Sequence, residues 1–569
     1  MPKPDNGKAG HLRSGTVEPN MTPNGYIRRW WKEAVVYQIY PRSFYDSNGD
    51  GIGDLRGLLD KLPHILDLGV DVIWLSPHFD SPNRDNGYDI RDYRKVGADY
   101  GTMADFDALM TAVKAAGKRL IIDLVVNHTS CEHSWFVESR TDAKSALRDY
   151  YIWHKGDTPP NDWTSIFGGS AWTRDEVTKD WYLHLFDSSQ PDLNWDNLAV
   201  RDEVYDLMRF WLDKGIDGFR MDVISFISKD KTFPNLAAAL RSRPQYAYTQ
   251  GPHLHQYLQE MHKDVLSHYD ITTVGEAFGV TLEDTPLLID ERRCELDMIF
   301  QFEAVEVDRD QNGRWKPWTL PELKAIFTRQ DKALDQHCWP TVFLSNHDNP
   351  RIVSRFGNDS ETWRIKSAQV LACLILTLKG TPFLYQGDEF GLTNLTFSDI
   401  DQTNDVWTRN AWRDEVLTGK ISATAFFANQ DRLSRDHARA PIPWTAEGGF
   451  TTGTPWFALN PKFSSINAQS SEAVCLWYKD LIALRHRCDA LIYGDYCDLC
   501  PDHPHVFAYT RTLKDEAFLI LLNFSEQVQI LSPLVPEGAM TLELTNYKDR
   551  SHVDNLWKLR GWEACIYRL

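Results

Sequence analysis

Three carboxylic acids in this sequence follow short apolar segments that resemble buried strands. Asp222 ends the segment Gly-Phe-Arg-Met-Asp, Glu276 follows Gly275, and Asp348 closes an Asn-His-Asp triplet. One such acid alone would more often be a solvated loop residue or a member of an ion pair, but three in equivalent positions favour a shared site. Paired carboxyls suit glycosidic-bond cleavage, because an ionised one attacks the sugar while a protonated one releases the leaving group.

An arginine and two histidines accompany these acids. Arg220 lies two residues before Asp222, so both side chains point to the same face of a strand. We expect its guanidinium to keep Asp222 ionised by proximity. His128 and His347 follow apolar segments in the same way. All these groups would converge on one mouth in a barrel, since barrel chemistry gathers at the C-terminal ends of the strands.

Apolar runs of strand length alternate with amphipathic helical stretches along the chain. This alternation favours a closed (β/α)8 TIM barrel, in the α/β class, over an open doubly wound sheet. The strand-like runs are residues 35–40, 70–75, 119–126, 218–224, 271–275, 296–302, 340–345 and 381–385, and the helical stretches include residues 202–212, 254–269, 320–334 and 367–378.

Two segments break the alternation. Residues 128–197 are polar and rich in Trp, Asp and Ser, and they are too long for an ordinary loop. We expect them to form an inserted domain after the third strand. From residue 493 the helical patterns stop, which predicts a C-terminal antiparallel β-sandwich domain over residues 493–569. The barrel would comprise residues 29–127 and 198–492, after a flexible N-terminal tail of residues 1–28.

Bulk properties narrow the function classes. The 569 residues carry a net charge of −19, which disfavours a nucleic-acid partner. No apolar stretch approaches the roughly 18 residues that span a bilayer, and the N-terminus lacks the apolar core of a signal peptide. Of nine cysteines only Cys497 and Cys500 form a C-x-x-C pair, without the second pair of a zinc site. We expect free thiols, no membrane association and a cytoplasmic protein.

Five short segments resemble, in order and spacing, the conserved regions of the α-amylase superfamily (glycoside hydrolase family 13). They are residues 123–128 (DLVVNH), 190–194 (QPDLN), 218–222 (GFRMD), 275–276 (GE) and 346–348 (NHD). The resemblance runs from about residue 31 to the C-terminus. It implies a retaining α-glucosidase on a barrel with an inserted domain and a C-terminal β-domain.

The resemblance also implies roles for the acids. Asp222 would be the nucleophile, Glu276 the general acid/base, and Asp348 the residue that holds the glucose 2- and 3-hydroxyls, with Arg220 supporting Asp222. The other residues implied to contact substrate are Tyr88, His128, Phe167 and His347.

A further pair is implied at the outer edge of the sugar ring. Asp89, in Asn-Gly-Tyr-Asp, matches the acid that grips this edge, and Arg439 matches its usual partner. That pair walls off the pocket in exo-acting members, so the enzyme should take one terminal glucose from a di- or short oligosaccharide. The alternative is a plain surface ion pair.

The segment 46–54 offers oxygen donors at alternating positions around glycine turns, as in cages for hard cations. In oligo-1,6-glucosidases, which it resembles, this loop is a structural calcium or magnesium site. The alternative is an Asx/Gly turn without metal, and no cofactor is expected for catalysis. The candidate ligands are Asp46, Asn48, Asp50, Ile52 and Asp54.

Val223, directly after the candidate nucleophile, bears on linkage specificity. A valine there resembles the isomaltase type, which prefers α-1,6 links, whereas threonine marks the maltase type. The alternative is ordinary strand packing.

Phe278, Phe302 and Arg309 bear on the aglycone. The two phenylalanines resemble the aromatic clamp of sucrose isomerases, although two such residues near strand ends are usually core. The segment 306–310 resembles the charged loop of those isomerases but departs at its first two positions.

Together these features predict hydrolysis of isomaltulose, isomaltose and trehalulose by a double displacement. By family analogy we expect the enzyme to be a monomer. Two enzymatic alternatives stay open, a sucrose isomerase and a sucrose-hydrolysing α-glucosidase. A non-catalytic partner subunit of a membrane transporter would lack acids of the triad and carry an anchor, unlike this chain.

Overall fold

The predicted strand segments form one parallel sheet that closes into a barrel. The computed structural model describes residues 20–249, 251–535, 540–550 and 557–569. The barrel strands are β1 (Val36–Ile39), β2 (Val72–Leu75), β5 (Arg119–Val125), β9 (Gly218–Asp222), β10 (Thr272–Glu276), β11 (Met298–Phe300), β12 (Thr341–Val342) and β13 (Thr381–Tyr385). Their order is β11-β10-β9-β5-β2-β1-β13-β12. At the seam between β11 and β12, the Thr341 hydroxyl donates to the Ile299 carbonyl at 2.9 Å. The expected barrel is confirmed.

Helices surround the barrel through amphipathic faces. On α2 (Leu55–Leu68) the buried side chains include Leu58, Leu62 and Ile65, at helical spacing. The predicted helix over 254–269 is shorter than expected, because α7 ends at Asp264 and a 3-10 turn follows. The remaining helices from residue 30 to 493 outside the insertion are α1 (Trp30–Glu33), α3 (Met103–Ala115), α5 (Leu198–Asp213), α6 (Gln245–Tyr248), α7 (Leu254–Asp264), α8 (Thr285–Ile289), α9 (Leu320–Ala333), α10 (Ile352–Phe356), α11 (Arg364–Thr377), α12 (Val406–Ala411), α13 (Ala423–Leu433), α14 (Asp436–Arg439), α15 (Glu472–His486) and α16 (Asp489–Tyr493).

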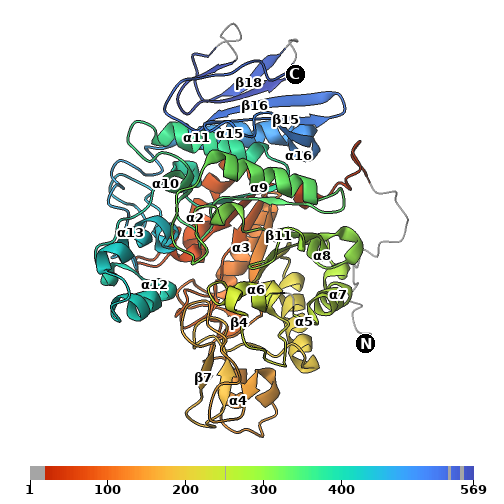
Figure 1. Cartoon of the computed structure of the whole chain (residues 1–569), viewed down its shortest axis with the longest axis vertical. Helices are drawn as coiled ribbons and strands as arrows, with labels where there is room; N and C mark the ends of the chain where they lie inside the picture. Colours follow the sequence, from red (N-terminus) through yellow and green to blue (C-terminus); the bar gives the residue numbers. More distant parts are fainter. Residues whose placement is uncertain (1–19, 250, 536–539, 551–556) are drawn as a thin grey trace, which may run out of the picture.

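The segment after β5 forms a small layer at one end of the molecule (Figure 1). It contains α4 (Ser134–Ser139) and a sheet of β6 (Trp153–His154), β8 (Trp181–Leu183) and β7 (Trp172–Arg174), in that order. Its apolar side chains share one buried cluster with Val223 and Phe226, which follow β9. The insertion therefore forms one side of the barrel mouth. A second short hairpin, β3 (Phe79–Asp80) with β4 (Asp92–Val96), carries the loop that leads to Tyr88.

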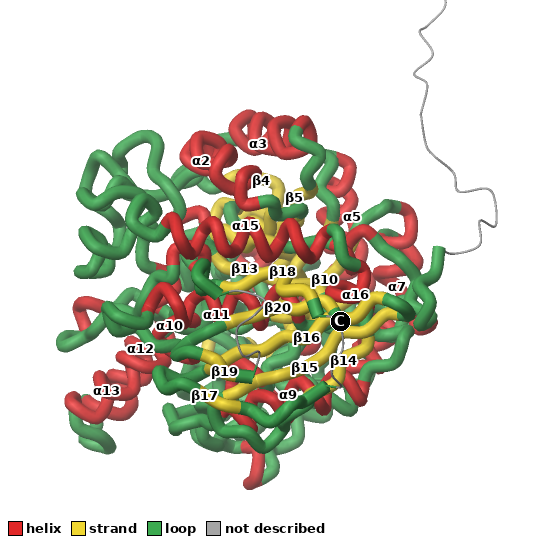
Figure 2. Tube along the Cα trace, turned by 90° about the horizontal axis from the view of Figure 1, so that it is seen from above, coloured by secondary structure: helices red, strands yellow, loops and turns green. Residues whose placement is uncertain are grey.

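An antiparallel sheet covers the opposite end of the molecule, as expected from the sequence. Its order is β14 (Asp495–Asp498), β15 (Val506–Leu513), β16 (Glu516–Asn523), β20 (Ala564–Arg568) and β18 (Thr541–Thr545), beside a pair of β17 (Gln529–Ile530) and β19 (Lys558–Leu559). Figure 2 shows these strands running side by side. Arg511 on β15 is buried and donates to the carbonyls of Thr377, Leu491 and Gly494, which ties this sheet to the barrel helices.

The N-terminal segment differs from expectation where it is described. Residues 1–19 of the expected tail lie outside the described residues, but residues 20–28 form a turn against the barrel. Tyr26 is buried and packs edge-on against Trp339 at 5.3 Å, and Asn24 donates to the Tyr493 carbonyl at 2.9 Å. Burial of one large aromatic side chain explains why residues 20–28 pack against the barrel.

Two further expectations concern membranes and cysteines. Over the described ranges, every helix is too short or too polar to cross a bilayer. All nine cysteines are free thiols, including the exposed Cys497 and the half-buried Cys500.

Candidate active site

One buried guanidinium gathers three carboxylates at the C-terminal ends of adjacent strands. Arg220 Nη1 lies 2.7 Å from Asp123 Oδ1 and 2.5 Å from Asp222 Oδ1, and its Nη2 lies 2.7 Å from Glu276 Oε2. Strand register sets this up, because Asp123 on β5 is paired directly with Arg220 on β9. Arg220 is only 1% exposed, so its contacts with the acids replace those with water.

Burial shifts the two candidate catalytic carboxyls toward neutral pH. It raises the pKa of Asp222 to about 6 and that of Glu276 to about 7, although Arg220 acts in the opposite direction on both. Arg220 favours the ionised form of Asp222 as expected, but the loss of water outweighs this attraction and leaves the pKa above its usual value. Near pH 6.5 the site can therefore hold one ionised and one protonated carboxyl, as acid-assisted nucleophilic displacement requires.

The peptide after Asp222 is strained toward Glu276. Val223 has φ 34° and ψ 41°, in the left-handed region that a β-branched residue rarely adopts. This turn aims the Val223 N–H at Glu276 Oε2, which accepts it at 3.1 Å. Backbone strain is thus stored at the point that holds the second carboxyl.

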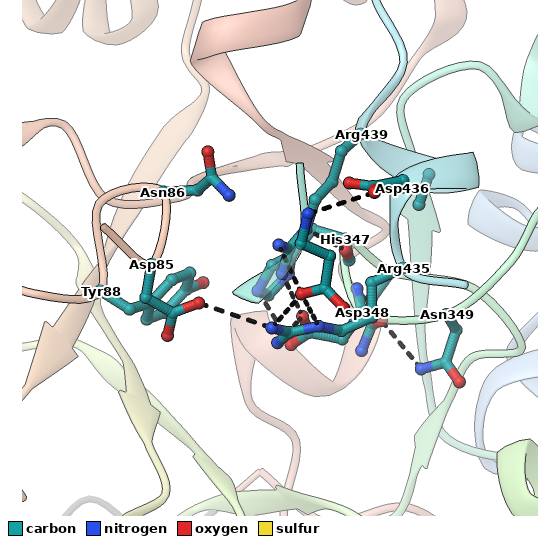
Figure 3. A network of polar contacts seen from close by, with 12 residues as sticks. Asp85, Asn86, Tyr88, His347, Asp348, Asn349, Arg435, Asp436 and Arg439 are labelled. Carbon is teal, nitrogen blue, oxygen red and sulfur yellow. Dashed lines mark hydrogen bonds and ion pairs between the residues drawn. The ribbon is translucent and has the colours of Figure 1, made fainter. Parts of the chain in front are cut away.

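Asp348 lies in a separate cluster of opposite charges (Figure 3). Its Oδ1 lies 3.0 Å from Arg435 Nη1 and 2.7 Å from Arg439 Nη2, and its Oδ2 lies 3.0 Å from His347 Nε2. Burial alone would raise the pKa of Asp348, but His347 and the two arginines outweigh it and hold this pKa well below its usual range. Asp348 therefore stays an acceptor for hydroxyl groups at all ordinary pH values.

The expected pair of Asp89 and Arg439 does not wall the pocket. Asp89 is fully buried, and its carboxylate accepts from Ser81 and from the backbone N–H groups of Arg84 and Asp85. The turn through Asn86 and Gly87, with φ of 51° and 104°, folds Asp89 back onto that loop. Arg439 lies beneath the pocket, bound to Asp348.

Asp85 and Arg435 occupy the wall instead. Arg435 Nη2 lies 3.5 Å from Asp85 Oδ1, and both residues line the pocket (Figure 3). Burial raises the pKa of Asp85 to about 7, against the pull of Arg435. Asp85 is held from behind by Gln190, whose amide donates to Oδ2 at 3.0 Å. Sequence reasoning missed this pair, although Asp85 stands four residues before the chosen acid and Arg435 four before the chosen arginine.

Asp405, also missed, anchors Arg435. Its Oδ1 accepts from Arg435 Nε at 2.9 Å and Nη2 at 2.5 Å, while its Oδ2 accepts from the Thr408 N–H and hydroxyl at 3.0 and 2.8 Å. One carboxylate thus caps α12 and clamps Arg435. The next residue but one, Trp407, lines the pocket.

These groups surround a pocket of about 750 Å³ at the barrel mouth. Phe278 and Phe302 form an aromatic pair on one side, with ring centroids 5.2 Å apart. Arg220 and His347 lie beneath the floor rather than on the surface, and His347 stacks on Tyr88 at 5.1 Å. The predicted residues that do line the pocket are Tyr88, His128, Phe167, Asp222, Val223, Glu276, Phe278, Phe302, Arg309 and Asp348.

The candidate metal loop is held by its own hydrogen bonds. Asp46 Oδ1 accepts the N–H groups of Asn48 and Gly49 at 3.0 and 2.8 Å, and Asp54 caps α2 through the Gly57 N–H at 2.7 Å. Nowhere in the described part of the chain do three or more His, Cys, Asp or Glu side chains gather as a metal cluster. The loop offers carboxylate and amide oxygens at alternating positions, and the Ile52 carbonyl occupies one of these positions. Such oxygen ligands fit a hard cation.

Comparison with known proteins identifies the family. Residues 38–494 match the alpha-amylase catalytic domain, so the chain belongs to the alpha-amylase family. The oligo-1,6-glucosidase of Parageobacillus thermoglucosidasius is 46% identical over 560 residues, covering 95% of this chain and 99% of that enzyme. The trehalose-6-phosphate hydrolase of Bacillus subtilis (strain 168) is 43% identical over 559 residues, covering 95% and 98%.

Solved structures of sucrose isomerases are also close. The isomaltulose synthase SmuA from Protaminobacter rubrum superimposes with a TM-score of 0.92 at 45% identity, covering 95% of this chain and 99% of that one. The trehalulose synthase MutB from Pseudomonas mesoacidophila MX-45 gives 0.91 at 44% identity, with coverage of 95% and 99%. Inactive or mutated forms of MutB were solved with isomaltulose and with the substrate sucrose.

Asp405→Asn should weaken sugar binding without unfolding the protein. The amide keeps the shape but loses the charge that clamps Arg435, and charge-assisted bonds contribute about 1.5–3 kcal/mol. We expect kcat/KM for 4-nitrophenyl α-glucoside to fall by about 10- to 100-fold, in steady-state assays. In the double variant Asp405→Asn/Arg435→Ala, kcat/KM should fall little further than in Arg435→Ala alone, because both changes break the same contact.

The matched control is Asp401→Asn, an exposed acid in the same loop, which should leave kcat/KM unchanged. Additive losses for Asp405 and Arg435 would show that the two residues act independently and would contradict the clamp.

Proposed function

We propose that the chain is a retaining, exo-acting α-glucosidase that hydrolyses terminal α-1,6-linked glucose from short sugars such as isomaltose and isomaltulose. The chain is a glycoside hydrolase by family. The observation that carries the finer proposal is the pair of Asp222 and Glu276 at the base of the pocket, both in contact with one guanidinium beneath them, with pKa values of about 6 and 7.

Asp222 would attack the anomeric carbon as the ionised nucleophile. Glu276 would protonate the leaving oxygen, and the bond to that oxygen would break as the glucosyl-Asp222 ester forms. Glu276, then ionised, would take a proton from water, which displaces Asp222 and returns both groups to their starting states. The contact of both carboxyls with Arg220 supports the short separation that distinguishes retaining from inverting enzymes, about 5–5.5 Å against 6.5–9.5 Å.

One glucose unit would fill the inner pocket. Asp348, fixed by two arginines, would accept the glucose 2- and 3-hydroxyls, and the bridge of Asp85 with Arg435 would meet the outer edge of the ring. Because this bridge closes the pocket, chain ends enter and internal chain segments do not. That geometry supports an exo-acting enzyme.

Val223 would set the linkage preference, and three other residues would contact the aglycone. Val223 lines the pocket beside Asp222. Threonine at this position would replace a methyl group by a hydroxyl group and so offer the substrate a polar contact that valine cannot make. Phe278 and Phe302 supply apolar faces, and Arg309 a cation, on the leaving-group side. The oligo-1,6-glucosidase relatives support an α-1,6 preference.

A sucrose isomerase is the second candidate. The aromatic pair, Arg309 and the close solved structures favour it. In that reaction the released fructose, rather than water, would attack the glucosyl-Asp222 ester through a different hydroxyl. The charged loop departs from the isomerase pattern at its first two positions, Glu306 and Val307, and this departure favours hydrolysis.

A product-resolved assay on isomaltose, isomaltulose, maltose and sucrose separates the candidates. We expect free glucose mainly from the two α-1,6 sugars, and Val223→Thr should raise kcat/KM for maltose relative to isomaltose by about tenfold, the scale of one pocket contact. Chromatography of the products gives both results. Accumulation of isomaltulose or trehalulose from sucrose, with little free glucose, would replace the hydrolase by the isomerase.

The two pKa values predict a narrow bell-shaped pH profile of kcat/KM. Activity should rise as Asp222 ionises near pH 6 and fall as Glu276 loses its proton near pH 7, with both limbs belonging to the coupled pair. With 4-nitrophenyl α-glucoside, whose leaving group needs no proton, Glu276→Gln should remove the alkaline limb. If the alkaline limb persists in this variant, it belongs to another group, such as Asp85.

We further infer that the loop of Asp46, Asn48 and Asp50 binds Ca²⁺ or Mg²⁺. Calorimetry should give a higher Tm in about 1 mM Ca²⁺ than in a chelator. A cation that binds only the folded state stabilises that state by mass action. Asp50→Ala should abolish the shift while leaving Tm in chelator nearly unchanged, since Asp50 is exposed. An equal Tm with and without Ca²⁺ and Mg²⁺ would leave the loop as a metal-free turn.

A further inference from the structure

A second buried guanidinium, that of Arg355, lies behind the leaving-group side of the active-site pocket. Arg355 belongs to the short helix α10. This helix buries Ile352, Val353 and Phe356 in the core, so it fixes the root of the arginine side chain. Arg355 is not among the described residues that line the pocket, but it contacts residues that do.

The Arg355 guanidinium holds one loop of the pocket at two points. Its Nε donates to Asp308 Oδ2 at 2.7 Å and its Nη2 lies 2.5 Å from Asp308 Oδ1, a bidentate ion pair in which both side chains are buried. Nη2 also donates to the Val305 carbonyl. The two contacts lie on either side of Glu306, and the second is directly before Arg309. The guanidinium therefore sets the place of two charged residues that line the pocket.

The remaining nitrogen of Arg355, Nη1, connects this loop to the turn that carries Asp348. It donates to Asn349 Oδ1 at 3.0 Å, and Asn349 Nδ2 donates to Asn346 Oδ1 at 2.8 Å. The same Asn346 oxygen accepts the Asp348 N–H at 2.8 Å. Because two arginines and a histidine already fix the Asp348 carboxylate, this turn is the rigid partner of the link.

The link also bears on the charges of the loop. Arg309 is buried, and its pKa is lowered by burial first and by the nearby Arg355 second, while Glu306 and Asp308 act in the opposite direction. Two guanidinium groups thus share one loop with two carboxylates. Separation of Asp308 from Arg355 would leave a buried charge without its partner, which is costly, so the loop would have to shift.

We propose that Arg355 is a positioning residue for the leaving-group sugar. It transfers the fixed position of the Asp348 turn to the loop that carries Glu306 and Arg309. Asp348 keeps its own arginine partners without Arg355, so loss of the link displaces the aglycone wall and spares the glucose pocket. This inference rests on the proposed glucosidase function and deepens it, since it names a residue behind the pocket that sets aglycone binding.

The test compares a substrate that has a sugar as its leaving group with one that has not. Isomaltose needs the aglycone wall, whereas the leaving group of α-glucosyl fluoride is a single atom. Arg355→Lys keeps the charge but loses the planar fork that reaches three acceptor groups. We expect kcat/KM for isomaltose to fall by about 100-fold, the scale of a misplaced substrate, while kcat/KM for α-glucosyl fluoride stays within about threefold.

Arg329→Lys is the matched control. Arg329 on α9 forms an ion pair with Glu303, at the start of the same loop, but Arg329 is exposed. The same substitution there should leave both kcat/KM values unchanged, because exposed ion pairs contribute little.

Asp308→Asn is the second variant, for the case that Arg355→Lys does not fold. It keeps the shape of the side chain but loses its charge, and it should show the same split between the two substrates. In the double variant the loss on isomaltose should be little larger than in Arg355→Lys alone, because both changes break one contact.

Equal losses on isomaltose and α-glucosyl fluoride would show a general defect of the fold and would overturn the positioning role. An unchanged kcat/KM for isomaltose in both variants would overturn it as well. Failure of the unmodified enzyme to release glucose from isomaltose would instead overturn the proposed function. The disaccharide that the enzyme does cleave, such as sucrose, would then replace isomaltose, and its comparison with α-glucosyl fluoride would still decide the role of Arg355.

Discussion

The site depends on one buried cation among three buried acids. Asp123, Asp222 and Glu276 leave water together, and Arg220 is the cation in direct contact with all three. One positive charge cannot balance three negative ones, so the protein must keep part of this cluster protonated. Burial is the main reason that the pKa of Glu276 reaches about 7, and the neighbouring Asp222 and Asp348 add to it against the pull of Arg220. Acid/base chemistry thus follows from the burial of these acids together, which the barrel enforces through the register of β5, β9 and β10.

Substrate recognition uses the opposite balance. Around Asp348 two arginines and a histidine face one carboxylate, and Asp405 and Asp85 supply the compensating charges from outside. Asp348 is therefore permanently ionised. The groups come from different parts of the fold, since Arg435 precedes α14 and Asp85 belongs to the β3–β4 connection. The barrel brings together an acid-rich floor that exchanges protons and an arginine-rich wall in which Asp348 stays ionised.

The sequence was sufficient for Arg220, Asp222 and Glu276 on the floor, but not for Asp123 beside them or for the wall. Strands β9 and β10 end at the predicted acids because each acid follows an apolar run whose alternation and length read directly as a strand. The choice between Asp85 and Asp89 depends on the left-handed turn at Asn86 and Gly87, which no apolar pattern reveals. Arg435 and Arg439 stand one helical turn apart and both reach Asp348, so spacing alone could not rank them. Asp405 was missed because its partner Arg435 lies in another segment of the chain.

The central claim, a double displacement through Asp222, is tested most directly by trapping the glucosyl-enzyme. Incubation with 5-fluoro-α-glucosyl fluoride, followed by intact-mass measurement and peptide mapping, should place one fluoroglucosyl group on Asp222, with none on an Asp222→Asn variant. An adduct on another residue would contradict the assignment of Asp222. Turnover of the reagent to free sugar of inverted configuration, with no adduct, would contradict the retaining mechanism itself.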